Sequence, residues 1–251
     1  GSMEAPWRTI PWALAYVEEA TTDFPVTIHI GPGVFQDAVR MRPHTILQGA
    51  GQGQTTIQHY NPGDEENIVI EGADGAGLFD CTVTFPGDVV NVAALLRLRD
   101  VSMHVERVTF SGRSQPYTSG VRVFGLGASN TIIRYCLFTR MENGVWSANA
   151  EPVITRCRFY DIHGTAVFVR GPESDSKPDD AVPHLGAVEQ EETSLNSFED
   201  VAGKFIDNKS VATTMAQMNF YGEDMTEAAI AGKLSGSVEY VPYIDKSLAA
   251  G

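Results

Sequence analysis

Two carboxylates and a histidine stand just before two glycines in the middle of the chain. Glu142 precedes Gly144, while Asp161 and His163 precede Gly164. If these segments are neighbouring strands of one parallel sheet, about 4.8 Å apart, the two carboxylates should be close together. A carboxylate pair about 5 to 5.5 Å apart suits a retaining glycosidase, and a wider pair suits an inverting one. Glu142 and Asp161 are therefore the candidate catalytic residues, and His163 is a candidate substrate-binding residue.

Other uses of these side chains stay open. Glu142 and Asp161 could form a solvated acidic corner, or they could bind Ca²⁺ together with oxygen atoms from loops. No other cofactor is predicted, because the histidines and the cysteines Cys81, Cys136 and Cys157 follow no metal-ligand spacing. The three cysteines are instead expected to be small buried side chains.

Three further residues have side chains that commonly contact sugars. Arg122 and Trp146 each follow a glycine by two residues, and Arg97 occupies the comparable place one strand earlier. If all three point outward from one sheet, guanidinium groups and an indole ring lie in a row that could bind and stack on a chain of sugars. The same row could equally cover the sheet beneath a long loop.

These residues need a scaffold of many short strands, and the sequence repeats in a way that predicts one. Six segments end in phenylalanine, at Phe85, Phe110, Phe138, Phe159, Phe198 and Phe220. The steps between them are 25, 28, 21, 39 and 22 residues, a spacing typical of stacked repeats in which the longer steps carry loops. We expect a coil of about seven rungs with these rings stacked in its core.

A second repeat begins with glycine, at Gly120, Gly144 and Gly164. Each glycine is expected to supply the backbone conformation of a sharp corner. Strand alternation also places Cys136 and Cys157 at matching inward positions of consecutive rungs. These two cysteines should therefore be stacked, buried and reduced.

Both ends of the coil have segments that could cover an apolar end rung. From Trp7 to Ala20, apolar residues recur at the spacing of one helical face, which predicts an N-terminal cap helix. Near the other end, a helix is expected from Met225 to Leu234 and a strand from Val238 to Tyr243. The expected organisation is one domain over residues 1–251, with a cloning remnant and cap at 1–24, rungs at 25–218 and a C-terminal cap at 219–251.

A segment rich in proline and acid, residues 171–192, interrupts the repeats. It is expected to form a long surface loop within residues 171–194, beside the sheet that carries Arg122 and Trp146. Its carboxylates are Glu173, Asp175, Asp179 and Asp180. They would repel an acidic polysaccharide unless Ca²⁺ bridged the two, so any ligand should be a neutral glycan or should need Ca²⁺ for uronate binding.

Two stretches resemble a known fold family. Ile46 to Ile57, ILQGAGQGQTTI, follows strands broken by Gly31-Pro32-Gly33 and by Pro43. This arrangement resembles the first rung of pectin-methylesterase-like and pectate-lyase-like right-handed β-helices, with their "I-x-L-x-G-x-G-x-x-x-T-x-I" segment. Residues 219–222, NFYG, resemble the "N-x-W-G" ending of bacterial β-helix proteins, with Tyr221 in place of the usual tryptophan.

The resemblance implies an all-β, single-stranded right-handed parallel β-helix with an N-terminal helical cap and a short C-terminal helix and strand cap. Enzymes of this fold hold an acidic or neutral polysaccharide along the outer face of one sheet, and the family implies an extracellular or cell-surface location. No catalytic residue of the family is carried over. The later rungs lack the methylesterase pattern of Gln-Asp, a second Asp and an Arg, and the lyase-like Arg40 to Pro43 lies in the first rung's turn.

The charge of the chain limits its partners. With 18 Lys and Arg against 32 Asp and Glu, the formal net charge is −14, which repels phosphate backbones and anionic lipid heads. Nucleic acid and membranes are therefore not expected partners, and no apolar run approaches the roughly 20 residues of a membrane span. A polysaccharide or cell-surface glycan is the expected partner.

Two hypotheses of function follow. The first is a non-catalytic β-helix domain of a secreted or surface bacterial protein, with a structural or carbohydrate-binding role. The alternative is a polysaccharide lyase or glycoside hydrolase that acts in a groove at Arg97, Arg122 and Trp146.

Overall fold

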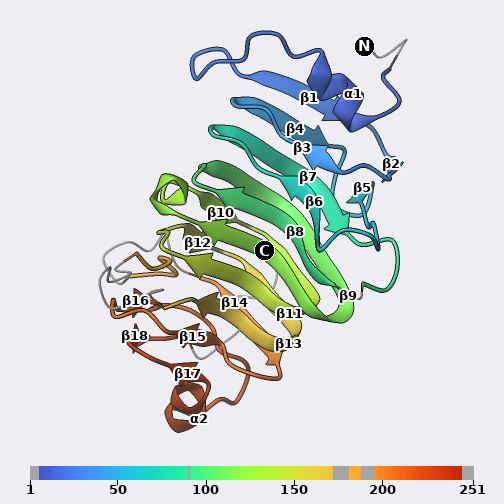
Figure 1. Cartoon of the computed structure of the whole chain (residues 1–251). Coiled ribbons are helices and arrows are strands. Elements are labelled where there is room, and N and C mark those ends of the chain that lie inside the picture. The colour runs from blue at the N-terminus through green and yellow to red at the C-terminus, as the bar shows by residue number, and fades with distance from the viewer. Residues whose placement is uncertain (1–5, 90, 172–180, 188–194, 245–251) are drawn as a thin grey trace.

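The computed structural model describes residues 6–89, 91–171, 181–187 and 195–244. The chain winds into a coil of short parallel strands between helix α1 (Ile10–Ala15) at one end and helix α2 (Glu227–Gly232) at the other (Figure 1). Successive turns of the coil add strands to three columns, which we call sheets 1, 2 and 3. The strand pairs within each column are parallel.

The three columns share several long strands that bend around the corners between them. Sheet 1 contains β1 (Val26–Ile30), β4 (Thr45–Gly49), the first parts of β7 (Ala76–Thr84) and β9 (Met103–Phe124), β10 (Ile132–Arg134) and β12 (Val153–Thr155). Sheet 2 contains β2 (Gly33–Phe35), β5 (Thr55–Gln58), later parts of β7 and β9, the first parts of β11 (Leu137–Ala148) and β13 (Arg158–Val169), and β14 (Ser197–Val201).

Sheet 3 shows the number of turns most clearly. It contains β3 (Val39–Arg40), β6 (Glu66–Glu71), β8 (Val92–Arg99), the last parts of β9, β11 and β13, β15 (Ile206–Asn208) and β17 (Leu234–Ser235). Along this column the described residues supply eight strands, against the prediction of about seven rungs. A 3-10 turn, η1 (Leu126–Ala128), and a short pair, β16 (Thr214–Met215) with β18 (Val238–Glu239), complete the elements.

A stack of aromatic rings runs through the core, as the phenylalanine repeat predicts. Phe110, Phe138, Phe159 and Phe198 lie ring on ring, with centroids 5.2, 4.8 and 5.0 Å apart. The predicted ends of the stack are wrong. Phe198 stacks on Tyr221 at 5.2 Å, so Phe220 is one residue out of register, and Val83 occupies the place aligned with Phe110 that was assigned to Phe85.

The cysteine prediction is confirmed. Cys136 and Cys157 occupy neighbouring places on adjacent rungs, next to the aligned pair Leu137 and Arg158. Both are buried free thiols. Burial, together with hydrogen bonding to Cys157, raises the pKa of Cys136 well above its ordinary value, and burial raises that of Cys81 to about 12.

The predicted role of the repeated glycines is wrong. The corner positions are held by other residues in the left-handed conformation, among them Tyr135, Arg140 and Asp161, with φ of 54°, 56° and 56°. Gly144 lies within a strand, where a Cβ would come 2.6 Å from the Ala166 carbonyl oxygen and from the Phe159 ring. Glycine is needed at position 144 because these neighbours leave no room for a side chain. Ala166, and not Gly164, is the residue that aligns with it.

The caps are shorter than predicted. The N-terminal helix spans six residues, and it buries Ile10, Ala13 and Leu14 toward the first rung. The Ile10 amide donates to Asp37 at 3.1 Å, and Arg42 donates to the Leu14 carbonyl at 3.4 Å. At the other end, α2 and β18 occupy only the middle and the start of the segments predicted as helix and strand.

The predicted long loop is only partly described. Residues 172–180 and 188–194 lie outside the described part, and with them the carboxylates Glu173, Asp175, Asp179 and Asp180. Residues 181–187 are not a surface loop. His184 bridges Val153 in parallel, Gly186 bridges Ala216, and Ala181, Val182 and Leu185 are buried, so this stretch continues sheet 1.

Candidate functional site

The outer face of sheet 3 carries the predicted row of sugar-binding side chains. Arg97 aligns with Arg122, Arg122 with Trp146, and Trp146 with Phe168, each on the next strand of the sheet. We call Arg97, Arg122, Trp146 and Phe168 the sheet-3 strip. Because alternate strand residues point to opposite faces, the neighbours Val121, Val145 and Val167 point into the core, where they are fully buried.

The two arginines of the strip are held by carboxylates from β6. Arg97 donates through Nε to both oxygens of Glu71, at 3.1 and 2.8 Å, and it also contacts Glu66. Arg122 donates to the other oxygen of Glu66 at 2.6 Å. Burial acts to lower the pKa of Arg97, but Glu71 and Glu66 raise it above its ordinary value; at Arg122 burial outweighs Glu66 and lowers the pKa. The positive charges of the two guanidinium groups are balanced by the carboxylates of Glu66 and Glu71.

Aromatic rings form the other half of the strip. The Trp146 ring lies 5.0 Å from Phe124 and 5.9 Å from Phe168, measured between centroids. The Arg170 guanidinium lies 5.9 Å from the Trp146 ring and the Arg99 guanidinium 5.8 Å from the Phe124 ring. Trp146 is half-buried, so part of a broad aromatic surface remains open on an outward face.

The candidate catalytic carboxylates lie on neighbouring strands but do not align. Thr139 pairs with Tyr160 and Met141 with Ile162, so the residue aligned with Asp161 is Arg140. Glu142 lies two residues beyond Arg140, at an irregularity in the pairing between Met141 and Asn143, and its carboxylate lies against Gly164. Asp161 instead contacts His163, with its Oδ1 3.2 Å from Nε2. Asp161 and His163 therefore contact each other, whereas the Glu142 carboxylate lies against Gly164.

The outer face of sheet 1 holds a hollow of about 480 Å³ that sequence reasoning missed. Gly75 and Gly77, at the start of β7, line this hollow. Neighbouring rings pack directly on both glycines: a Cβ on Gly75 would lie 2.3 Å from the His44 ring, and one on Gly77 would lie 2.4 Å from the Phe79 ring. The Phe79 ring meets the His104 ring edge-on at 5.1 Å. Polar side chains at the rim include Thr21, Asp74, Ser102 and Asn130.

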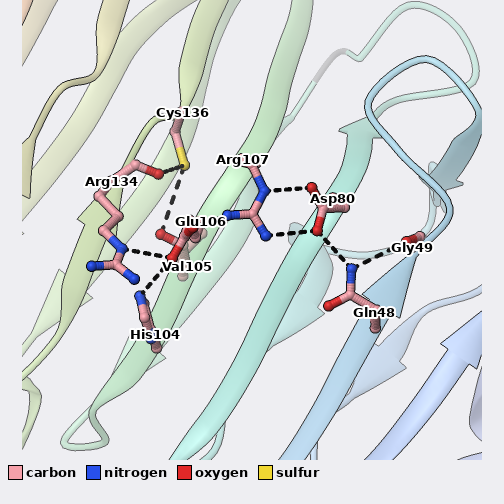
Figure 2. A network of polar contacts seen from close by, with 9 residues as sticks. All are labelled: Gln48, Gly49, Asp80, His104, Val105, Glu106, Arg107, Arg134 and Cys136. Carbon is pink, nitrogen blue, oxygen red and sulfur yellow. Dashed lines mark hydrogen bonds and ion pairs between the residues drawn. The ribbon is translucent and has the colours of Figure 1, made fainter.

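A network of charged groups lies beside this hollow (Figure 2). Glu106, which is almost wholly buried, contacts both Arg107 and Arg134, the latter through Nε at 2.6 Å. Arg107 also forms a two-pronged pair with Asp80, at 2.6 and 2.9 Å, and Gln48 donates to Asp80 at 2.6 Å. Hydrogen bonding from Arg107 is the main reason that the pKa of Asp80 lies below its ordinary value.

His104 joins the hollow to this network. Its Nε2 lies 3.3 Å from a Glu106 oxygen, without the geometry of a hydrogen bond, and its ring lines the hollow. Burial, and then the charges of Arg134 and Arg107, lower the pKa of His104 below 6.5. His44 and His104 follow no metal-ligand or catalytic spacing in the sequence, and only alignment of the rungs brings them to one surface.

Within the described ranges, no group of three or more His, Cys, Asp or Glu residues is arranged to hold a metal ion. The same part of the chain contains no helix that is long and apolar enough to cross a membrane.

Comparison with known proteins identifies the fold. No model of a known protein family matches the sequence, and no curated protein is similar to it. Among solved structures, the pectin methylesterase from Yersinia enterocolitica matches 87% of this chain and 80% of its own, at a TM-score of 0.62 and 11% identity. A deglycosylated pectin methylesterase from Aspergillus niger matches 99% and 86%, at a TM-score of 0.55 and 13% identity. The chain therefore has the right-handed parallel β-helix fold of the pectin methylesterases.

Proposed function

We propose that this chain is a non-catalytic β-helix domain of a secreted or cell-surface bacterial protein, and that it binds a polysaccharide or cell-surface glycan along the sheet-3 strip. The observation that carries the proposal is the half-buried Trp146 ring, placed between Phe124 and Phe168 on an outward face. Flat aromatic surface with polar groups at its edge is a common way to bind an amphipathic ligand such as a sugar.

The charges of the strip favour a neutral sugar. Arg97 and Arg122 are balanced by Glu66 and Glu71, so these four side chains together carry no net charge. An acidic sugar would have to compete with carboxylates that are already in place. The fold supports a carbohydrate-related role in general, since the two similar structures described above are pectin methylesterases, enzymes named for the polysaccharide pectin.

Binding is tested by affinity electrophoresis on a panel of neutral and acidic polysaccharides. Trp146→Ala should weaken binding to the best neutral polysaccharide at least tenfold, and Trp146→Phe, which keeps a ring, should weaken it less. Trp12→Ala is the matched control, because Trp12 is exposed on α1 and far along the coil from the strip. Unchanged binding by Trp146→Ala, with the protein folded, would contradict the strip as the sugar site.

The alternative is an enzyme acting in the same groove, and the candidate residues would be Glu142, Asp161 and His163. The register speaks for the non-catalytic role because the two carboxylates do not occupy aligned positions. Assays for new reducing ends, for unsaturated-uronate absorbance and for ester cleavage on methyl-esterified pectin should show no turnover, with and without added Ca²⁺. Turnover that disappears in Glu142→Ala or Asp161→Ala would establish the enzyme.

A further inference from the structure

The corner between sheets 1 and 2, together with the adjoining outer face of sheet 2, carries a second group of arginine and aromatic side chains. We call this group the arginine–tyrosine corner: Arg107, Arg134, Tyr135, Arg156, Arg158 and Tyr160. Its backbone repeats from rung to rung, with φ of 52° at Arg107, 54° at Tyr135 and 53° at Arg156. The flanking strand pairs align these three residues on consecutive rungs, so their side chains repeat at about the 4.8 Å spacing of parallel strands.

The guanidinium groups of this corner are exposed. The side chains of Arg107, Arg134 and Arg158 are 47%, 42% and 53% exposed, compared with 14% for Arg122 of the sheet-3 strip. The Tyr135 and Tyr160 rings beside them are 47% and 42% exposed.

Two of the arginines have donors to spare. Arg134 uses Nε to bind Glu106, and within the described part of the chain its two terminal nitrogens have no partner (Figure 2). Arg156 faces no carboxylate among the described residues, and its recorded contact is the Tyr135 ring at 5.8 Å. A guanidinium fork with unused N–H groups fits the two oxygens of a carboxylate or sulfate group.

The other two arginines are fixed in place by carboxylates. Arg107 is held between Asp80 and Glu106, and Arg158 pairs with Glu199 at 3.1 and 3.0 Å while it lies 4.9 Å from the Tyr160 ring. Among the described residues, four arginines therefore face three carboxylates, which makes this part of the corner locally positive on a chain whose formal net charge is −14. The anchoring also lowers the entropy lost when a ligand binds.

The regular spacing indicates a stiff, repeating ligand. Arg107, Tyr135 and Arg156 follow one another on three consecutive rungs, so a chain with anionic groups and sugar rings at a regular spacing can contact them in turn. A flexible acidic peptide would lose much more conformational entropy on binding to such an edge.

We propose that the arginine–tyrosine corner is a binding site for a carboxylate- or sulfate-bearing polysaccharide, with Arg134 and Arg156 as its principal anion-binding residues. The site is separate from the sheet-3 strip, and it does not depend on sugar binding there. It needs no metal ion, because the guanidinium groups contact the anionic groups directly.

The test is equilibrium binding of polygalacturonate and of heparin, each in EDTA and over a series of salt concentrations. Binding of at least one polyanion should weaken as salt rises, since arginine contacts release counterions. The double variant Arg134→Gln with Arg156→Gln should weaken it at least tenfold and should reduce the salt dependence. Arg8→Gln with Arg40→Gln removes the same charge far from the corner, and it should change affinity less than twofold.

The possible results separate the sources of the anionic group and the competing ligand classes. Preference for polygalacturonate assigns carboxylate, and preference for heparin assigns sulfate; either supports the site. The proposal is overturned if neither polyanion binds in EDTA, if both double variants weaken binding equally, or if poly-glutamate or single-stranded RNA binds as tightly as the polysaccharides. Trp146→Ala should leave polyanion binding unchanged, so a failure of the sheet-3 strip is distinguishable from a failure here.

Discussion

The sheet-3 strip and the arginine–tyrosine corner use the same residue types on the same scaffold, and they differ in how the arginines are satisfied. On sheet 3, Arg97 and Arg122 lie half-buried and are matched by Glu66 and Glu71 across the rungs. At the corner, the described residues include more arginines than carboxylates. The side chains of Arg107, Arg134 and Arg158 are each about half exposed. Which ligand a β-helix face can bind therefore depends less on which residues point outward than on whether neighbouring rungs already supply their partners.

Removing a ring from the central stack should have the largest effect, because it weakens the support of both surfaces. Phe138 is fully buried between Phe110 and Phe159, and Phe138→Ala should lower the free energy of unfolding by about 3–5 kcal/mol. Urea denaturation measures the change. Phe24→Ala, at a ring that is 78% exposed, is the matched control and should cost far less; equal losses would show that the stack is not the source of stability.

The comparison can be sharpened by making the strip resemble the corner. Glu66→Gln removes the carboxylate shared by Arg97 and Arg122. Arg97 keeps its pair with Glu71, but Arg122 loses its ion pair and should become available to an anionic sugar. Stability should fall by about 1–3 kcal/mol, the range for hydrogen bonds to charged groups. Salt-dependent binding of polygalacturonate should increase, and it should survive Arg134→Gln with Arg156→Gln.

The control for that variant is Glu18→Gln, which makes the same charge change at an exposed position near the N-terminus. If it increases polyanion binding as much as Glu66→Gln does, then net charge and not the release of Arg122 explains the effect.

A smaller effect, of pH on stability, is expected at His104, beside the Glu106 carboxylate that holds Arg107 and Arg134 of the corner. The folded-state pKa of His104 lies below 6.5, so the folded protein binds fewer protons at this residue than the unfolded chain does. Stability from this group is therefore present above pH 6.5 and is lost as pH falls toward the folded-state pKa. Unfolding free energies measured from pH 8 to 5 should fall less steeply in His104→Gln than in the native chain; parallel curves would contradict the assignment.

The sequence predicted the coil and part of its register because apolar alternation and phenylalanine spacing directly reflect the core. Phe110, Phe138, Phe159 and Phe198 stack as expected. The predictions for the two ends of the ring stack were wrong because aligned residues need only fill the same space. Tyr221 takes the ring position beside Phe198, and Val83 aligns with Phe110.

The candidate sites were harder to predict because they depend on the length of every intervening turn. Asp161 aligns with Arg140, so Glu142 lies two residues beyond the aligned position, and counting back from Gly144 and Gly164 does not reveal this register. Arg122 and Glu66 are 56 residues apart and meet only because the turns between them bring β6 close to β9. Corners were expected at Gly144 and Gly164, but the left-handed positions ahead of those strands are Arg140 and Asp161, which carry no turn signal in the sequence.

The most direct test measures the native chain, Trp146→Ala, and Arg134→Gln with Arg156→Gln in one experiment, each against a neutral and an anionic polysaccharide in EDTA. The account predicts that Trp146→Ala loses at least tenfold in affinity for the neutral polysaccharide alone. The arginine double variant should lose at least tenfold for the anionic polysaccharide alone. A single variant that loses both affinities, or two variants that lose neither, would contradict two chemically distinct sugar-binding surfaces on this β-helix.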